Sequence, residues 1–231
     1  MISGIIFDMD GTLVDTEHIH YSSYYETLQN YGITISPEEY FDLWTRQGKR
    51  FKDYMELKNL ELDYDKVIWE KRHLFNQKLV SELVVYPHAV ETVKELSARM
   101  PLALVTGSHR VNVDMILKIT GLEGCFKYIL TGDDHSKHKP DPEGFLMAAD
   151  ALRIEPSSCL VIEDAQKGII SANRAGMKSI AIPNKYTKTN DFSTATKVLG
   201  SISEITDELL NSLWNKKNHI PNKIPKKLLI N

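Results

Sequence analysis

The sequence predicts an α/β fold built on a parallel β-sheet with helices on both faces. Short apolar runs alternate with segments of helical length along most of the 231 residues, and this alternation is typical of sheets whose successive strands are connected by helices. Each run is rich in Ile, Val or Leu, as strands covered on both faces tend to be. One helical stretch near the N-terminus interrupts the alternation, which indicates an inserted domain.

Five apolar runs are the predicted strands, and four longer segments between them are predicted helices. We expect the strands at 2–7, 101–105, 127–130, 159–162 and 178–182. We expect the helices at 88–100, 111–120, 142–152 and 165–175. Gly121 and Gly176 directly follow two of these helices, and glycine commonly ends a helix because it adopts a left-handed conformation without steric cost.

The helical stretch that breaks the pattern follows the first strand. It contains no strand-like run, and we expect its helices at 16–31, 37–45, 51–57 and 65–81. We therefore predict a core domain made of residues 1–15 and 84–213, with an α-helical domain at 16–83 inserted into it. Residues 214–231 are rich in lysine, contain proline and lack acids. This composition predicts a loose basic tail.

The composition is that of a soluble globular protein. Hydrophobic residues make up 42% of the chain, which is enough for a sizeable core. The net charge of -3 shows no basic excess, so nucleic acid is not an expected partner. No apolar stretch reaches the ~20 residues of a membrane span, and the N-terminus lacks the pattern of a secretory leader. Since Cys125 and Cys159 are expected to be reduced, we expect a cytoplasmic protein, and we expect it to be a monomer.

Polar side chains gather in the loops that follow the first four predicted strands. In order along the chain they are Asp8, Asp10 and Gly11; Thr106, Gly107 and Ser108; Lys139; and Glu163 with Asp164. Ligands of parallel sheets bind outside the carboxyl ends of the strands, so we expect these loops to meet. Taken singly, each loop has an ordinary explanation as a turn, a helix cap or a solvated segment. Together their acids, lysine, hydroxyls and backbone amides fit metal-assisted phosphoryl transfer.

The order of these residues resembles the haloacid dehalogenase superfamily. The four matching motifs are Asp8-x-Asp10-Gly11-Thr12, Thr106, Lys139 and Glu163-Asp164. The stretches 8–16 and 162–177 are similar to the family's most specific signatures, and the resemblance covers about residues 1–205. The chain looks most like the subfamily of β-phosphoglucomutase and phosphoglycolate-type phosphatases. That resemblance implies a Rossmann-like three-layer core with an α-helical cap inserted after the first strand.

The resemblance implies a chemistry for the two aspartates of the first loop. Asp8 is expected to attack the phosphorus atom and form an aspartyl-phosphate. Asp10 is expected to protonate the leaving oxygen and later to accept a proton from the attacking water. An aspartate at this second position marks the phosphotransferases, and the dehalogenases of the superfamily lack it.

The remaining motif residues are, by the same resemblance, ligands of Mg²⁺ and of the phosphoryl group. The expected metal ligands are Asp8, the main-chain carbonyl of Asp10 and Asp164, with Glu163 in support. The expected phosphate-binding residues are Lys139, Thr106, Gly11, Gly107 and Ser108. Preorganised cations and donors at these oxygens lower the barrier, because negative charge develops there during transfer.

The expected activity is hydrolysis of a small phosphomonoester, since a cap that closes over the site leaves room only for a small substrate. A sugar-phosphate mutase resembling β-phosphoglucomutase is the alternative. Thr16 and His20 match the hinge and cap start of such mutases, although His20 also suits a half-buried position on the cap helix. A catalytically inactive binding module is a second alternative. It would need a broken motif, and none of the four is broken.

The cations that would bind a second phosphate bear on the choice between phosphatase and mutase. Lys49 and Arg50 are the cap candidates for this role. His73 and His109 stand where mutases carry lysine, and histidine is mostly uncharged at neutral pH. A weaker second phosphate site favours the phosphatase.

Overall fold

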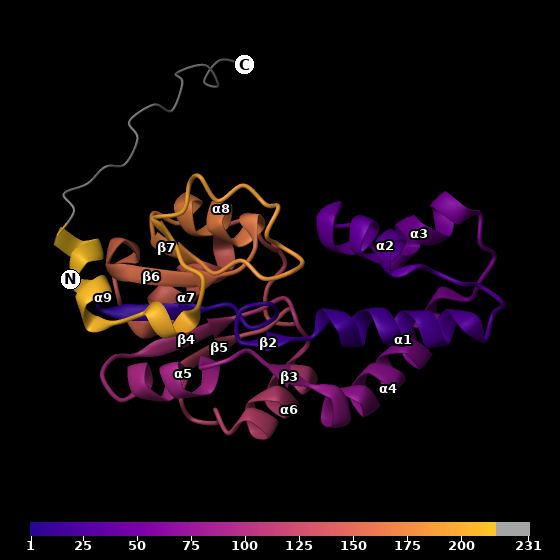
Figure 1. Cartoon of the computed structure of the whole chain (residues 1–231), viewed down its shortest axis with the longest axis horizontal. Helices are drawn as coiled ribbons and strands as arrows, with labels where there is room; N and C mark the ends of the chain where they lie inside the picture. The colour runs from indigo at the N-terminus through magenta and orange to yellow at the C-terminus, as the bar shows by residue number, and fades with distance from the viewer. Residues whose placement is uncertain (216–231) are drawn as a thin grey trace, which may run out of the picture.

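The computed structural model describes residues 1–215, and its centre is a six-stranded β-sheet (Figure 1). The strand order is β5-β4-β1-β6-β7-β8, and all neighbours are parallel. The strands are β1 (Gly4–Phe7), β4 (Leu102–Val105), β5 (Tyr128–Leu130), β6 (Cys159–Glu163), β7 (Lys178–Ala181) and β8 (Lys197–Val198). The predicted α/β fold is confirmed. The sequence pattern does not predict β8, because its two residues are exposed and form no apolar run.

Helices cover both faces of the sheet, because alternate residues of each strand point to opposite sides. Ile5 and Phe7 of β1 belong to the apolar cluster that contains the buried side chains of α5, α6 and α9. Ile6 belongs to the cluster beneath α7 and α8. The helices are α5 (Ala89–Ser97), α6 (Arg110–Thr120), α7 (Glu143–Leu152), α8 (Gln166–Arg174) and α9 (Asp207–Asn215), with short 3₁₀ turns at Pro156–Ser158 and Ile202–Glu204. The sequence pattern does not predict α9.

The order of the strands brings the first and fourth polar loops together. The chain runs outward from β1 through β4 to β5 and then returns to place β6 on the other side of β1. Phe7 therefore pairs with both Leu104 of β4 and Ile162 of β6. In open α/β sheets, ligands bind at such a switch point, outside the carboxyl ends of the strands. The loops after β1, β4 and β6 all begin there.

The helical insertion consists of α1 (Glu17–Gln29), α2 (Pro37–Tyr40), the π-helical turn η1 (Phe41–Arg46), α3 (Phe51–Lys58) and α4 (Tyr64–Glu82). It leaves and rejoins the core through an antiparallel pair, β2 (Val14–Asp15) and β3 (Val84–Val85). Figure 1 shows these helices beside the sheet, beyond the ends of its strands. The two connecting strands are too short to give a pattern in the sequence.

The insertion has an apolar cluster of its own, dominated by aromatic rings. Tyr24, Tyr40 and Phe51 are buried in it together with Leu28 and Val67. The predicted helix at 37–45 is wrong in detail, since the structure divides it into α2 and η1. Trp44 of the π-helical turn stacks on Tyr40, and the centroids of the two rings lie 5.0 Å apart.

None of the helices in residues 1–215 is long and apolar enough to cross a membrane. The predicted basic tail, 214–231, lies outside the described residues except for its first two, which end α9.

Candidate active site

The carboxyl ends of β1, β4 and β6 bring the predicted motif residues into one acidic site. The residues in contact there are Asp8, Asp10, Gly11, Thr16, Thr106, Ser108, Lys139, Glu163 and Asp164. Gly107 contributes its main chain only. A Cβ atom on Gly132 would collide with the carbonyl oxygen of Gly107, so glycine at 132 lets the loops after β4 and β5 touch.

Lys139 is the cation at the centre of this site. Its Nζ lies 2.6 Å from Asp8 Oδ1 and 2.9 Å from Glu163 Oε1, and it also donates to the carbonyl of Val105. Burial alone would lower the pKa of this ammonium. The charges of Asp8 and Glu163 outweigh burial and hold the Lys139 pKa above its ordinary value. Lys139 therefore stays charged, and the two carboxylates fix the position of its ammonium group.

Glu163 is oriented by its neighbours on both sides of the carboxylate. Oε1 accepts from Lys139, and Oε2 accepts from the backbone N–H of Ala165 at 2.8 Å. A Cβ atom on Gly168 would collide with Glu163 Oε1, so the carboxylate occupies space that only glycine leaves open. The contact explains why a glycine in the first turn of α8 belongs to the site.

Three hydroxyl groups hold the carboxylate of Asp10. Thr16 donates to Oδ1 at 2.7 Å, and Thr106 and Ser108 donate to Oδ2 at 2.7 and 2.8 Å. Thr16 immediately precedes α1, so the first helix of the insertion begins at a residue bonded to the catalytic loop. The sequence predicts each of these residues at the site. It does not predict that they bind one another.

Asp164 is held from the loop after β7, by a residue that the sequence analysis misses. Asn184 Nδ2 donates to Asp164 Oδ2 at 2.8 Å and to the carbonyl of Gly11 at 3.0 Å. Thr12 Oγ1 lies 3.4 Å from the other oxygen of Asp164. Gly11 has φ +92°, and a Cβ there would lie 2.5 Å from Asp164 Oδ2. Only glycine therefore allows the two loops to approach this closely.

The site carries more negative than positive charge. Burial, with help from Glu163, raises the pKa of Asp8 to about 7 against the opposing effect of Lys139. Burial and then the charges of Glu163 and Asp8 raise the pKa of Asp164 well above its ordinary value. Three carboxylates thus share a single lysine. A further cation would relieve the repulsion and favour the ionised form of both aspartates.

The donor set fits a hard divalent cation. Asp8 Oδ2 is buried and has no hydrogen-bond partner, and such an orphaned oxygen is a ligand that Mg²⁺ or Ca²⁺ accepts. Among the described residues, no group of three or more His, Cys, Asp or Glu side chains is arranged to hold a metal. Two carboxylates, Asp8 and Asp164, together with main-chain oxygen, remain the donors that fit.

The insertion contributes a buried cation, Lys71 of α4, which the sequence analysis also misses. Its Nζ lies 2.6 Å from Nδ1 of His20 and over the rings of Tyr24 and Phe75 at 4.9 and 4.6 Å. No carboxylate among the described residues forms an ion pair with it. Burial lowers the Lys71 pKa to about 7, although the charge of Glu17 opposes this effect. His20 is stacked on Phe75, and burial and then Lys71 lower its pKa well below the ordinary value.

The predicted correspondence between His73 and the cap lysine of mutases stays a prediction, but the structure shows that the buried cation of α4 is Lys71. His73 lies on the exposed face of α4, where its ring stacks on Trp69 at 5.6 Å. Lys71 lies on the face that packs against α1. A helix turns by 100° per residue, so two positions along α4 change an exposed residue into a buried one.

The other predicted cations, on the insertion, form no described contact with the acidic site. Lys49 and Arg50 are exposed, and neither side chain is hydrogen-bonded to the catalytic loops within residues 1–215. Burial, then His135 and then Arg50 lower the pKa of His138.

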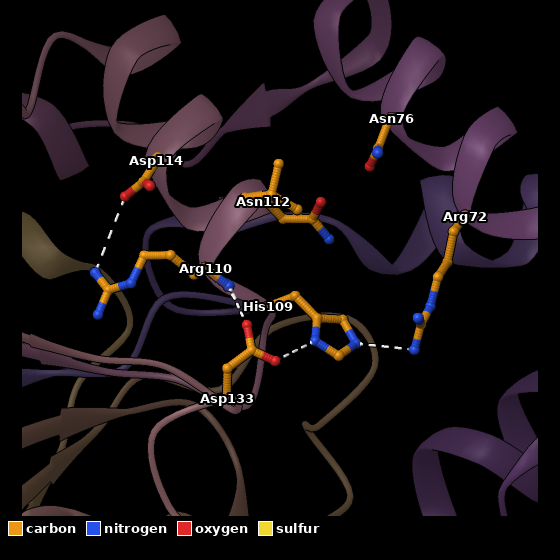
Figure 2. A pocket seen from close by; sticks show the side chains of 8 residues that line it. Arg72, Asn76, His109, Arg110, Asn112, Asp114 and Asp133 are labelled. Atoms are coloured by element: carbon orange, nitrogen blue, oxygen red, sulfur yellow. Dashed lines mark hydrogen bonds and ion pairs between the residues drawn. The ribbon is translucent and has the colours of Figure 1, made fainter. Parts of the chain in front are cut away.

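His109 joins the insertion to the core at a cavity of about 520 Å³ between α4 and α6. Figure 2 shows its ring between Asp133, 2.6 Å from Nδ1, and Arg72 of α4, 3.2 Å from Nε2. Arg110 points away from the catalytic loop and donates to Asp134 and to the carbonyl of Ile129.

Comparison with known proteins shows the family of the chain. The family model described as haloacid dehalogenase-like hydrolase matches residues 5–182. A fructose-1-phosphate phosphatase from Escherichia coli, YqaB, is 33% identical over 78% of this chain and 96% of its own length. The structure of CbbY from Rhodobacter sphaeroides in complex with phosphate superimposes with a TM-score of 0.79 at 27% identity, over 88% of this chain and 96% of that one. A β-phosphoglucomutase structure from Clostridium difficile gives a TM-score of 0.75 at 25% identity, over 93% and 98%.

Lys71→Met should stabilise the protein, and more so at low pH. The folded pKa of Lys71, about 7, is below its unfolded value of 10.5. The folded state therefore resists protonation, so the penalty is complete below pH 7 and fades as pH rises toward 10.5. We expect a gain of about 1–4 kcal/mol in the free energy of unfolding at pH 6 and less than half of it at pH 9.5.

Urea unfolding in EDTA at both pH values measures this gain. Lys78→Met is the matched control, because Lys78 lies on the same helix but forms ion pairs with Glu26 and Glu82. We expect no gain from the control. An equal gain from Lys71→Met at both pH values would contradict a charge-based penalty.

Proposed function

Because the chain belongs to the haloacid dehalogenase-like hydrolases, we propose that it is a Mg²⁺-dependent phosphatase that hydrolyses a small phosphorylated metabolite through an aspartyl-phosphate on Asp8. The observation that carries the proposal is the asymmetry of the Asp8 carboxylate. One oxygen is bonded to Lys139, and the other is buried without a partner. The bond to Lys139 fixes the direction of the carboxylate for nucleophilic attack, and the oxygen without a partner is left for the cation.

Lys139 has two tasks in this mechanism. Its charge favours the ionised, nucleophilic form of Asp8. The same ammonium offsets the repulsion between the Asp8 carboxylate and an approaching phosphoryl group. Glu163 keeps the ammonium in place through a bond that does not involve the reacting atoms.

Asp10 is the proposed general acid and base, and the substrate itself prepares it. The hydroxyls of Thr106 and Ser108 both donate to Asp10 Oδ2. Each hydroxyl has a single proton to donate. When a phosphoryl oxygen takes these donors, Oδ2 of Asp10 becomes free to carry a proton to the leaving oxygen. Thr16 continues to hold the other oxygen.

The proposed metal ligands are the carboxylates of Asp8 and Asp164 and the main-chain carbonyl of Asp10, with Glu163 in support. Mg²⁺ held by these residues would supply positive charge that offsets the repulsion between the attacking carboxylate and the phosphoryl group. Asn184 holds Asp164 in the required orientation, and Gly11 leaves room for it.

The helical segment 16–83 is the proposed cap, and Lys71 is its proposed substrate contact. Burying an ammonium that lacks an ion-pair partner is costly, so such a charge persists where it binds something. An anionic or strongly polar part of the substrate beside His20 would satisfy it. The names of the phosphatase relatives support a phosphorylated sugar as the substrate class.

A sugar-phosphate mutase is the second candidate, and the position of Lys71 is the observation in its favour. A mutase must bind a second phosphate, and Lys71 adds a cation that His73 would not. The core side argues for the phosphatase. His109 is held between Arg72 and Asp133, and Arg110 is occupied by Asp134. An inactive binding module is disfavoured, because the residues of all four motifs are present and in mutual contact.

Hydrolysis of p-nitrophenyl phosphate tests the proposed chemistry directly. We expect turnover with Mg²⁺, loss of turnover in excess EDTA and recovery when Mg²⁺ is restored. Asp8→Asn should reduce kcat by on the order of 10³-fold or more, because the attacking oxygen and one metal charge are removed. A circular dichroism spectrum identical to wild type controls for folding. Full turnover in a thoroughly chelated sample would contradict the metal site.

The leaving group tests the role of Asp10. Asp10→Asn should lower kcat for an alkyl phosphate by about 10²–10⁴-fold, since an alkoxide needs a proton to leave. The loss for p-nitrophenyl phosphate should be much smaller, since p-nitrophenolate hardly needs protonation. Equal losses on both substrates would show that Asp10 is not the general acid.

The product formed from β-glucose 1-phosphate distinguishes a phosphatase from a mutase. With a catalytic amount of glucose 1,6-bisphosphate, we expect little glucose 6-phosphate. A screen of sugar monophosphates should instead release free phosphate from one or more of them. Rapid formation of glucose 6-phosphate without phosphate release would identify a mutase. It would also mean that Lys71 provides the second phosphate site that the core side lacks.

A further inference from the structure

The loop after β7 contacts both the acidic site and the helical insertion. Asn184 reaches Asp164, and Tyr186, two residues later, reaches the insertion. Neither residue belongs to the four motifs. The loop therefore connects two parts of the molecule that come together only in the folded chain.

The side chain of Asn184 is bonded at both ends. Its Nδ2 donates to Asp164 Oδ2 and to the carbonyl of Gly11, at 2.8 and 3.0 Å. Its Oδ1 accepts from the backbone N–H of Tyr186 at 2.8 Å and of Thr187 at 3.2 Å. With donors and acceptors both occupied, the amide cannot turn unless the backbone at 186 and 187 moves. The position of that backbone therefore fixes the direction of the Asp164 carboxylate.

The backbone at Tyr186 is in turn tied to the insertion. The Tyr186 ring lies 4.8 Å from the ring of Phe41, the first residue of η1, with an interplanar angle of 32°. Lys185 Nζ lies 4.7 Å from the centre of the Tyr186 ring and 3.0 Å from Asp15 Oδ2, at the point where the chain enters the insertion. A movement of the insertion away from the core must break the contact between the two rings.

We propose that Asn184 is a positioning residue for Asp164, and that the ring contact between Tyr186 and Phe41 makes this positioning depend on closure of the insertion. The inference rests on the proposed function only in that Asp164 binds a divalent cation. Linkage is reciprocal, so if closure orders Asp164 for the cation, the cation favours closure. The enzyme would then assemble its cation site most completely when the cleft is shut around substrate.

Calorimetric titration of the full, substrate-free chain with Mg²⁺ tests the first half of the proposal. Asn184→Ala should weaken Mg²⁺ binding by about 10–100-fold, the usual effect of removing a group that orients a metal ligand. Melting in EDTA monitors the fold, and each titration is run well below the melting temperature of its variant. Unchanged Mg²⁺ affinity in Asn184→Ala would overturn the positioning role and leave the proposed phosphatase intact. Failure of the wild-type chain to bind Mg²⁺ would overturn both.

A double-mutant cycle tests the dependence on closure. Phe41→Ala and Tyr186→Ala should each weaken Mg²⁺ binding by several-fold, whereas Tyr186→Phe keeps the ring and should bind nearly as wild type does. Phe41→Ala added to Asn184→Ala should cause little further loss, because both act through one chain of contacts. Additive losses, or wild-type affinity in Phe41→Ala, would overturn the coupling.

Arg72→Ala is the matched control for the cycle. It removes another contact between the insertion and the core, the one to His109 (Figure 2), without touching the loop that holds Asp164. We expect unchanged Mg²⁺ affinity in this variant. An equal loss in Arg72→Ala and Phe41→Ala would overturn the specific path through Tyr186, because any loosening of the insertion would then suffice.

Discussion

Lys139 balances three carboxylates at the end of the sheet, and the geometry of the site follows from this imbalance. Its Nζ binds Asp8 and Glu163, while Asp164 lies beside them and forms no ion pair within residues 1–215. Burying an ionised carboxylate without a partner costs free energy, and this cost raises the pKa of the group. The acids are close together because β1 and β6 are neighbours and an acid lies at the carboxyl end of each strand. This excess of negative charge suits the site to a divalent cation.

Close approach of the backbone makes this charge density possible. Gly11 has no side chain to separate its loop from Asp164, and Gly168 leaves the space that Glu163 fills. Hydroxyls and amides then orient the acids: Thr16 holds Asp10, and Asn184 holds Asp164. Each carboxylate is held by at least one group from outside its own loop, so no single loop could build the site alone. The substrate can take over some of these donors without rearranging the backbone.

The helical insertion carries the proposed substrate contact, Lys71, as a buried ammonium. The aromatic cluster of the insertion forms a core independent of the sheet, and we expect the burial of this charge beside it to cost stability. The insertion also contacts the core in two places, through Arg72 with His109 and through Phe41 with Tyr186. The first contact is polar and exposed. The second is aromatic and is connected through Asn184 to the acidic site. Under the proposed coupling, only this second contact would link closure of the insertion to the orientation of Asp164.

The sequence by itself determined the parallel sheet and the residues of the four motifs. A strand buried on both faces must be an apolar run, and the polar residues that end such strands have one edge of the sheet on which to lie. Tertiary structure alone decided that Lys71, not His73, lies inside the insertion, because this depends on which face of α4 turns toward α1. It also decided that Asn184 holds Asp164. That contact joins two loops from neighbouring strands, and no local pattern of residues records which side chain of one loop will reach the other.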